Sequence, residues 1–164
     1  MIKAAILTVS DRGSRGERAD RSGPALVSWL ETHGAKVTRT AIVPDESAQI
    51  SSRLAEWADR GICELLLTTG GTGVSPRDVT PDATAEILDR VIPGFGEIMR
   101  LKGVEKTPMA IISRAIAGIR RETLIINLPG SPNGALENLM AVWTAVPHAI
   151  EKILGDTRDC RSDI

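Results

Sequence analysis

Short apolar runs alternate along the chain with longer segments in which apolar residues recur every three or four positions. Two of the runs, 2–9 and 64–69, have the length and apolar content of strands that are buried in a parallel sheet. A third run, 37–43, is strand-like and ends at Pro44.

A segment with helical periodicity follows each of these runs. The first predicted helix begins at Ser22, which would cap it, and ends at Gly34. The second covers 50–61, and the third is opened by Thr80 and carries apolar residues as far as Val91.

The second half of the chain predicts two short helices and then two strands joined by a tight turn, at 95–101, 108–114, 115–120 and 122–128. A last helical region begins at Ser131, and Pro147 is expected to break or kink it. The residues of this region that are expected to face inward are Leu136, Leu139, Met140 and Trp143.

This regular alternation indicates an α/β fold: a three-layer domain with a mostly parallel central sheet and helices on both faces. The chain has 164 residues, which is the length of one domain. We therefore expect a single domain over 1–164 with a short polar C-terminal tail at 156–164.

Composition narrows the possible partners. The formal net charge is −1 and aromatic residues make up 2% of the chain, which argues against a nucleic-acid-binding surface. No segment predicts a signal peptide or a membrane span. Cys63 and Cys160 are too few and too far apart for a zinc cluster or a redox pair. We expect a cytoplasmic protein with neither nucleic acid nor membrane as a partner.

Polar and small residues follow four of the predicted strands. Asp11 follows the first, Asp45 the second, a glycine loop with Asp78 the third, and the segment 127–132 the last. Ligands of open α/β sheets bind beyond the carboxyl ends of the strands, so these segments predict one site at that edge. Each alone has an ordinary structural explanation, such as a helix cap or a turn, but that explanation does not account for their convergence.

The glycine loop, Gly70-Gly71-Thr72-Gly73, is the sharpest local signal. Closely spaced glycines let the backbone approach a ligand and turn its N–H groups toward an anion, and Thr69 and Thr72 add hydroxyl groups. No Gly-Lys-Ser/Thr follows, so the loop is not a P-loop. By itself the loop indicates phosphate or pterin binding.

Asp45 and Asp78 would face one pocket if their strands are neighbours. Two carboxylates beside a phosphate site suit Mg²⁺, which keeps several waters and takes one or two protein ligands. The alternative is that Arg77 and Arg114 pair with these carboxylates in a surface network.

The segments TTGGTG (68–73) and RDVTPDA (77–83) resemble the hallmark of the molybdopterin adenylyltransferase family, the Mog/MoaB-type domain that is similar to the G domain of gephyrin. Further matches to the family pattern are Ser10-Asp11-Arg12, Pro44-Asp45-Glu46, Pro93-Gly94-Phe95-Gly96-Glu97, Ser113-Arg114 and Asn127-Leu128-Pro129-Gly130-Ser131-Pro132. The resemblance covers essentially the whole chain.

This resemblance implies a parallel α/β domain that assembles as a homotrimer and transfers AMP from Mg-ATP to the terminal phosphate of molybdopterin, with release of pyrophosphate. It implies that Asp45 and Asp78 are the two essential carboxylates, which organise Mg²⁺ and the nucleotide. It also implies hand-over of the product to a molybdenum-insertion protein. The substrate-binding residues it implies are Asp11, Thr69, Gly70, Gly71, Thr72, Gly73, Glu97, Ser113, Arg114, Pro129, Gly130 and Ser131.

One position departs from the pattern, because Gly103 stands where the family commonly carries a serine. Two other functions stay open on the sequence: a non-catalytic scaffold that binds molybdopterin, and a phosphotransferase outside cofactor synthesis. Retention of Asp45 and Asp78 disfavours the first, and the lack of a P-loop or kinase motif disfavours the second.

Overall fold

The computed structural model describes residues 1–157 and contains one six-stranded sheet. Its strands are β1 (Ile2–Val9), β2 (Ala35–Val43), β3 (Leu65–Thr69), β4 (Arg90–Val91), β5 (Ala117–Arg120) and β6 (Thr123–Leu128). Their order is β2-β1-β3-β6-β5-β4. Strands β2, β1, β3 and β6 are mutually parallel, whereas β5 pairs antiparallel with both β6 and β4. The predicted α/β class with a mostly parallel sheet is confirmed.

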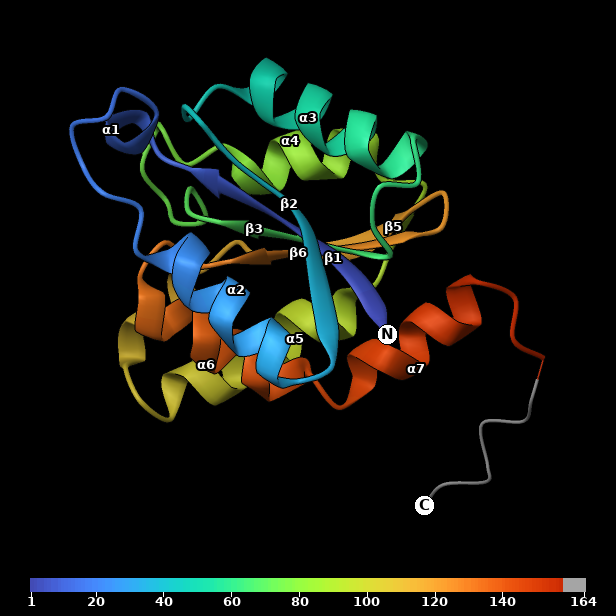
Figure 1. The fold of residues 1–164 in the computed structure, drawn as a ribbon. Helices are drawn as coiled ribbons and strands as arrows, with labels where there is room; N and C mark the ends of the chain where they lie inside the picture. Colours follow the sequence, from blue (N-terminus) through green and yellow to red (C-terminus); the bar gives the residue numbers. More distant parts are fainter. Residues whose placement is uncertain (158–164) are drawn as a thin grey trace.

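Helices cover both faces of the sheet, so the domain has three layers (Figure 1). On one face lie α2 (Ser22–Thr32), α5 (Pro93–Val104), α6 (Pro132–Val142) and α7 (Ala145–Ile153). On the other face lie α3 (Ser47–Asp59) and α4 (Thr80–Ile87). Two short elements complete the chain, α1 (Asp11–Ser14) and a 3₁₀ helix, η1 (Pro108–Ile112).

Strands β1, β3 and β6 form the middle of the core. Leu65 and Leu67 of β3 pack with one helical layer, and Leu66 between them packs with the other. The amide of Asn127 in β6 is fully buried and donates to the hydroxyls of Thr68, at 3.0 Å, and Thr84, at 2.9 Å. These bonds satisfy the amide that β6 places inside the core.

Two parts of the predicted helices are wrong. The helix opened by Thr80 ends at Ile87, and Val91 lies in the short strand β4 with 56% of its surface exposed. The backbone becomes extended at Leu88, and the residues that follow bond to β5, beginning with the Asp89 N–H, which donates to the Ile119 carbonyl oxygen at 2.8 Å. Met140, which was expected to face inward, is 49% exposed on α6.

The predicted cap of α2 is also wrong. Ser22 is the first residue of the helix, and the carboxylate of Asp20 instead accepts the Gly23 N–H at 3.0 Å. The break in the last helical region falls at Trp143 and Thr144, so that Pro147 lies in the first turn of α7, where it needs no N–H partner.

Cys63 is a core residue. It is 3% exposed, and burial raises the pKa of its thiol to about 12. Its carbonyl oxygen accepts the hydroxyl of Thr123 at 2.8 Å. Cys160 lies outside the described residues, as does most of the predicted tail. Within residues 1–157, no helix combines the length and apolarity that crossing a membrane requires.

Candidate functional site

Four strands deliver their carboxyl ends to one edge of the sheet (Figure 1). Asp11 begins α1 directly after β1, and Asp45 lies just past β2. The glycine loop follows β3, and Gly130 precedes α6 after β6. The structure therefore brings the predicted segments to the same edge because the strands that carry them are parallel.

Asp11 and Asp45 bind each other's backbone. The Asp11 N–H donates to Asp45 Oδ2 at 2.8 Å, and the Asp45 N–H donates to Asp11 Oδ1 at 3.0 Å. Because β1 and β2 are adjacent strands, this exchange fixes the ends of both strands and the direction of both carboxylates.

Arg77 binds Asp11 rather than the two predicted carboxylates. Its guanidinium donates to both oxygens of Asp11, at 2.9 and 3.1 Å, and to Glu46 at 2.9 Å. The hydrogen bonds from Arg77 hold the pKa of Asp11 below its ordinary value. Arg114 pairs with Asp82. The ion pairs among residues 1–157 thus include neither Asp45 nor Asp78, so the predicted alternative of a surface network is wrong.

The environment of Asp45 favours its neutral form. Burial raises the pKa of the Asp45 carboxyl above its ordinary value, and the negative charges of Asp11 and Asp78 act in the same direction. The N–H of Asp11 and the charge of Arg77 oppose this shift. Ionisation of Asp45 costs free energy in this environment. A cation or a positively polarised ligand at this position would stabilise the ionised carboxylate and so offset that cost.

The first half of the glycine loop admits no side chain. Gly70 and Gly71 have positive φ angles of 108° and 66°. A Cβ on Gly70 would lie 2.2 Å from the Val9 carbonyl oxygen, and one on Gly71 would lie 2.4 Å from Thr80 Oγ1 and 3.1 Å from Asp45 Oδ1. Glycine is therefore required at Gly71 both by the backbone conformation and by the approach of Asp45.

The second half of the loop meets the other predicted carboxylate. A Cβ on Gly73 would lie 2.8 Å from Asp78 Oδ2, an oxygen that also accepts the Ser75 N–H at 2.9 Å. The strands before Asp45 and Asp78 are not neighbours, because β1 lies between β2 and β3. The expectation that adjacent strands bring the carboxylates together is wrong; the glycine loop extends between them instead.

A cleft of about 440 Å³ opens at this edge. The predicted residues that line it are Asp45, Thr69, Gly70, Gly71, Gly130 and Ser131. The amino ends of α2 and α6 also border it, through Ser22 and Ser131, and helix amino ends favour anions. The cleft therefore combines exposed backbone, two helix ends and a carboxylate, which together suit a phosphate with its cation.

Among the lining residues that sequence reasoning missed are three charged ones, namely Arg18, Asp20 and Arg21. They come from the segment between α1 and α2. The signal was present, because Arg15, Arg18 and Arg21 recur at intervals of three residues just past the first strand. Exposed arginines at the rim of the cleft add positive charge for a phosphate ligand.

Several predicted residues have structural partners. Thr69 Oγ1 donates to the Pro129 carbonyl oxygen at 2.7 Å, which joins the loops after β3 and β6. The carbonyl of buried Thr72 accepts the Arg114 N–H at 2.8 Å. This bond places Ser113 and Arg114 beside the second half of the glycine loop, on the β5 side of the edge.

Glu97 lies apart from the cleft, exposed on α5. Arg100, one turn further along α5, donates to the Ser113 carbonyl oxygen at 3.4 Å and links this helix to the Ser113 segment. Gly103 packs against η1, where a Cβ would lie 2.7 Å from the Ala110 Cβ. A serine at this position would require α5 and η1 to separate.

Comparisons with known proteins point to one family. Residues 5–148 match the family described as a probable molybdopterin binding domain. The molybdopterin adenylyltransferase of Helicobacter pylori is 42% identical over 157 residues, which cover 94% of this chain and 89% of that protein.

Two solved structures share the fold. The molybdopterin biosynthesis enzyme MoaB of Thermus thermophilus superposes with a TM-score of 0.89 at 51% identity, over 95% of this chain and 98% of that one. The tungsten cofactor synthesizing protein MoaB of Pyrococcus furiosus gives a TM-score of 0.83 at 32% identity, over 93% and 96%. The motifs, the sheet order and these likenesses agree, and the chain belongs to the molybdopterin-binding domain family of Mog/MoaB type.

Proposed function

We propose that this protein transfers the adenylyl group of ATP to the terminal phosphate of molybdopterin, with release of pyrophosphate. The observation that carries the proposal is the placement of Asp45 against Gly71 in a cleft bordered by two helix amino ends. The Helicobacter pylori relative, which carries the name of this activity, adds support because it covers nearly the whole chain.

The chemistry requires two anions to meet, since a phosphate oxygen attacks the α-phosphorus of ATP. The bond from the α-phosphorus to the bridging oxygen breaks, and pyrophosphate leaves with the electron pair. Catalysis then consists mainly of positioning and of charge neutralisation. The backbone N–H of Gly71, the rim arginines and the helix ends supply the donors for both tasks, whereas the Gly70 N–H is used by the Leu128 carbonyl oxygen.

The residues at the edge fit a magnesium ion. Asp45 Oδ1 accepts no hydrogen bond within residues 1–157, and it lies beside the glycine loop where a phosphate would bind. No group of three His, Cys, Asp or Glu side chains in the described part of the chain forms a ready metal site. A site of one or two carboxylates completed by water and phosphate oxygens is the usual one for Mg²⁺. Asp45 and Asp78 would hold the ion, which would neutralise phosphate charge.

Pyrophosphate release from ATP with and without molybdopterin tests the proposal. We expect release only when both substrates and Mg²⁺ are present, together with an AMP-molybdopterin product by mass spectrometry. Binding of molybdopterin without release would identify a scaffold. Formation of ADP instead of pyrophosphate would identify a phosphotransferase.

We also propose a homotrimer, which works in the cytoplasm and hands its product to a molybdenum-insertion protein. The support is an exposed apolar patch, the α5–η1 patch, on the helices that follow β4. Its residues are Ile98, Leu101, Met109, Ile111 and Ile112, between 43% and 70% exposed. Met99, which lies between Ile98 and Leu101 in the sequence, is 1% exposed and packs in the core instead.

A further inference from the structure

One buried hydroxyl group has no hydrogen-bond partner. Thr80 Oγ1 is the only buried side-chain oxygen or nitrogen within residues 1–157 that neither donates nor accepts a hydrogen bond. The residue is 0% exposed and begins α4. An unpaired buried hydroxyl costs free energy, and a valine would fill much the same space without that cost. The hydroxyl is therefore expected to find its partner in another state of the molecule.

The backbone of Thr80 is fixed on both sides. Its N–H donates to the Gly71 carbonyl oxygen at 3.1 Å, and its carbonyl oxygen accepts the Thr84 hydroxyl at 2.8 Å. A threonine at the start of a helix often caps it, but this hydroxyl does not. It lies against the glycine loop instead, since a Cβ atom on Gly71 would overlap Thr80 Oγ1.

An unpartnered acceptor lies beside this unpartnered donor. The same Cβ on Gly71 would lie 3.1 Å from Asp45 Oδ1. That oxygen accepts no hydrogen bond within residues 1–157, whereas Asp45 Oδ2 accepts the Asp11 N–H at 2.8 Å. The absence of a side chain at Gly71 thus leaves one small space that a hydroxyl and a carboxylate oxygen both border.

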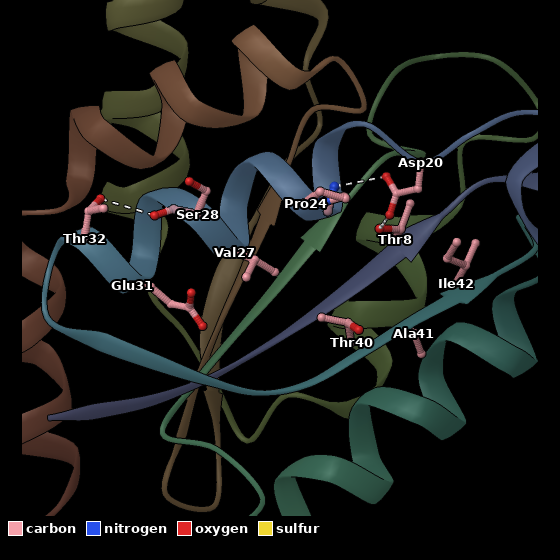
Figure 2. A pocket seen from close by; sticks show the side chains of 11 residues that line it. Thr8, Asp20, Pro24, Val27, Ser28, Glu31, Thr32, Thr40, Ala41 and Ile42 are labelled. Atoms are coloured by element: carbon pink, nitrogen blue, oxygen red, sulfur yellow. Dashed lines mark hydrogen bonds between the residues drawn. The ribbon is translucent and has the colours of Figure 1, made fainter.

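A second glycine shows the same arrangement with the hydrogen bond formed. A Cβ on Gly23 would overlap Asp20 Oδ2 and lie 3.0 Å from Thr8 Oγ1. There the Thr8 hydroxyl donates to Asp20 Oδ2 at 2.7 Å, beside the groove between α2 and β2 (Figure 2). In this pair, a threonine hydroxyl reaches a carboxylate across the space that a side chain on the glycine would fill.

We propose that Thr80 is a positioning residue whose hydroxyl donates to Asp45 Oδ1 when Mg²⁺ and the nucleotide phosphates are bound, an assignment that rests on the proposed function. Asp11 would then hold one oxygen of the carboxylate and Thr80 the other. An ionised carboxylate has about four acceptor sites, so both hydrogen bonds leave sites free for the ion. Removal of such a bond to a metal-binding carboxylate typically lowers metal affinity by about 10–100-fold.

Thr80→Val tests the proposal, because it removes the donor and keeps the shape of the side chain. Since the lost group is unpaired, the variant should melt no lower than the unmodified protein when no ligand is present. By calorimetry, we expect its affinity for Mg-ATP to fall about tenfold or more and its affinity for ATP in EDTA to stay unchanged. Thr80→Ser keeps a hydroxyl and should restore Mg-ATP binding.

Thr123→Val is the matched control. Thr123 is 1% exposed, and its hydroxyl donates to the Cys63 carbonyl oxygen at 2.8 Å, at the end of β6 that lies away from the cleft. This variant loses a formed hydrogen bond, so it should melt a few degrees lower and bind Mg-ATP normally. If Thr80→Val behaved in the same way, its hydroxyl would be a structural group and the proposal would be overturned.

A double-mutant cycle shows whether Thr80 acts through Asp45. In an Asp45→Asn background, Thr80→Val should weaken Mg-ATP binding by less than about twofold, because the carboxylate that it positions is already gone. A full tenfold loss in that background would contradict the assignment. Thr80→Ala removes the same donor and should give the same results if a valine at this position prevents folding.

The two proposals fail separately. If Thr80→Val weakens Mg-ATP binding but the unmodified chain releases no pyrophosphate, the positioning role stands and the proposed transfer fails. If the unmodified chain releases pyrophosphate and Thr80→Val binds Mg-ATP and turns over normally, the transfer stands and the positioning role fails. An unmodified chain that binds no Mg-ATP would overturn both.

Discussion

Asp45 and Asp78 are the residues on which the proposed transfer depends most directly. Both are partly exposed at loop positions, so their charges contribute little to packing. Each lies against one half of the glycine loop, through Gly71 and Gly73. A loss of charge at either position should therefore leave the fold intact and act mainly on the ligand and its cation.

We expect Asp45→Asn and Asp78→Asn each to lower adenylyl transfer by about a hundredfold or more, because each removes charge stabilisation at the reacting phosphates. Glu46→Gln is the control, since Glu46 is an exposed neighbour that binds Arg77. Pyrophosphate release gives the rate, and circular dichroism shows whether the fold is kept. Near-normal turnover in both aspartate variants would contradict the assignment of these residues.

Asp11 and Asp45 exchange hydrogen bonds, yet their carboxyl groups have pKa values shifted in opposite directions. For Asp45 the folded pKa is raised, so its ionisation costs folding free energy as the pH rises above its ordinary value of about 4. For Asp11 the folded pKa is lowered, so ionised Asp11 stabilises the fold at neutral pH. That stabilisation is lost only when the pH falls through the lowered pKa.

Without Mg²⁺, Asp45→Asn should therefore raise the melting temperature at pH 7, and the gain should shrink as the pH approaches about 4. Asp11→Asn should lower the melting temperature at pH 7, and its deficit should persist at pH 4. Thermal unfolding of both variants across this range gives the two profiles. Parallel profiles would contradict the opposite environments that the structure assigns to the two carboxyl groups.

At the scale of elements, the glycine loop is restricted in two ways, by its backbone conformation and by the atoms packed against it. Gly71 has a positive φ, and its missing Cβ leaves room for Thr80 Oγ1 and Asp45. Gly94 in the first turn of α5 has open space at its Cβ position and no positive φ. The two glycines therefore make a matched pair.

Gly71→Ala should destabilise the fold by about 1–3 kcal/mol through backbone strain and should weaken molybdopterin binding in the folded variant. Gly94→Ala should change stability by less than about 0.5 kcal/mol. Chemical denaturation and equilibrium binding measure the two effects. Equal behaviour of the two variants would remove the loop from the site.

The elements that the sequence predicts best are those whose burial is uniform. The strands β1, β3 and β6 are apolar because both faces are covered, and the pattern alone identified them. The strand β4 has two residues, both exposed, and is held by its pairing with β5, so no local pattern marks it.

Residues of the site at strand ends were predictable from topology. Asp20 was not, because its role comes from a contact with Thr8 on another element.

At the scale of the whole molecule, the α5–η1 patch predicts association. Exposed apolar surface of this kind is uncommon on a protein that remains a monomer. Three copies related by a closed rotation would cover the patch with equivalent contacts.

Light scattering at micromolar concentration should give three times the chain mass of 17.5 kDa. Ile111→Glu should lower the mass to that of one subunit, since Ile111 is 70% exposed and a buried carboxylate at an interface is costly. His148→Gln, on the exposed side of α7, is the control. A monomer or a stable dimer of the unmodified chain would contradict the proposed trimer.

Because Cys63 is buried, its chemical labelling can measure how often the domain opens. A thiol with a pKa of about 12 in a closed core is unreactive toward alkylating reagents at neutral pH, because the thiolate is the attacking species. Labelling of Cys63 must therefore wait until the chain around β3 detaches and the thiol regains its ordinary acidity. In a Cys160→Ser background, the alkylation rate measures the frequency of these native-state openings. Each ligand that holds the strand ends together should lower the alkylation rate.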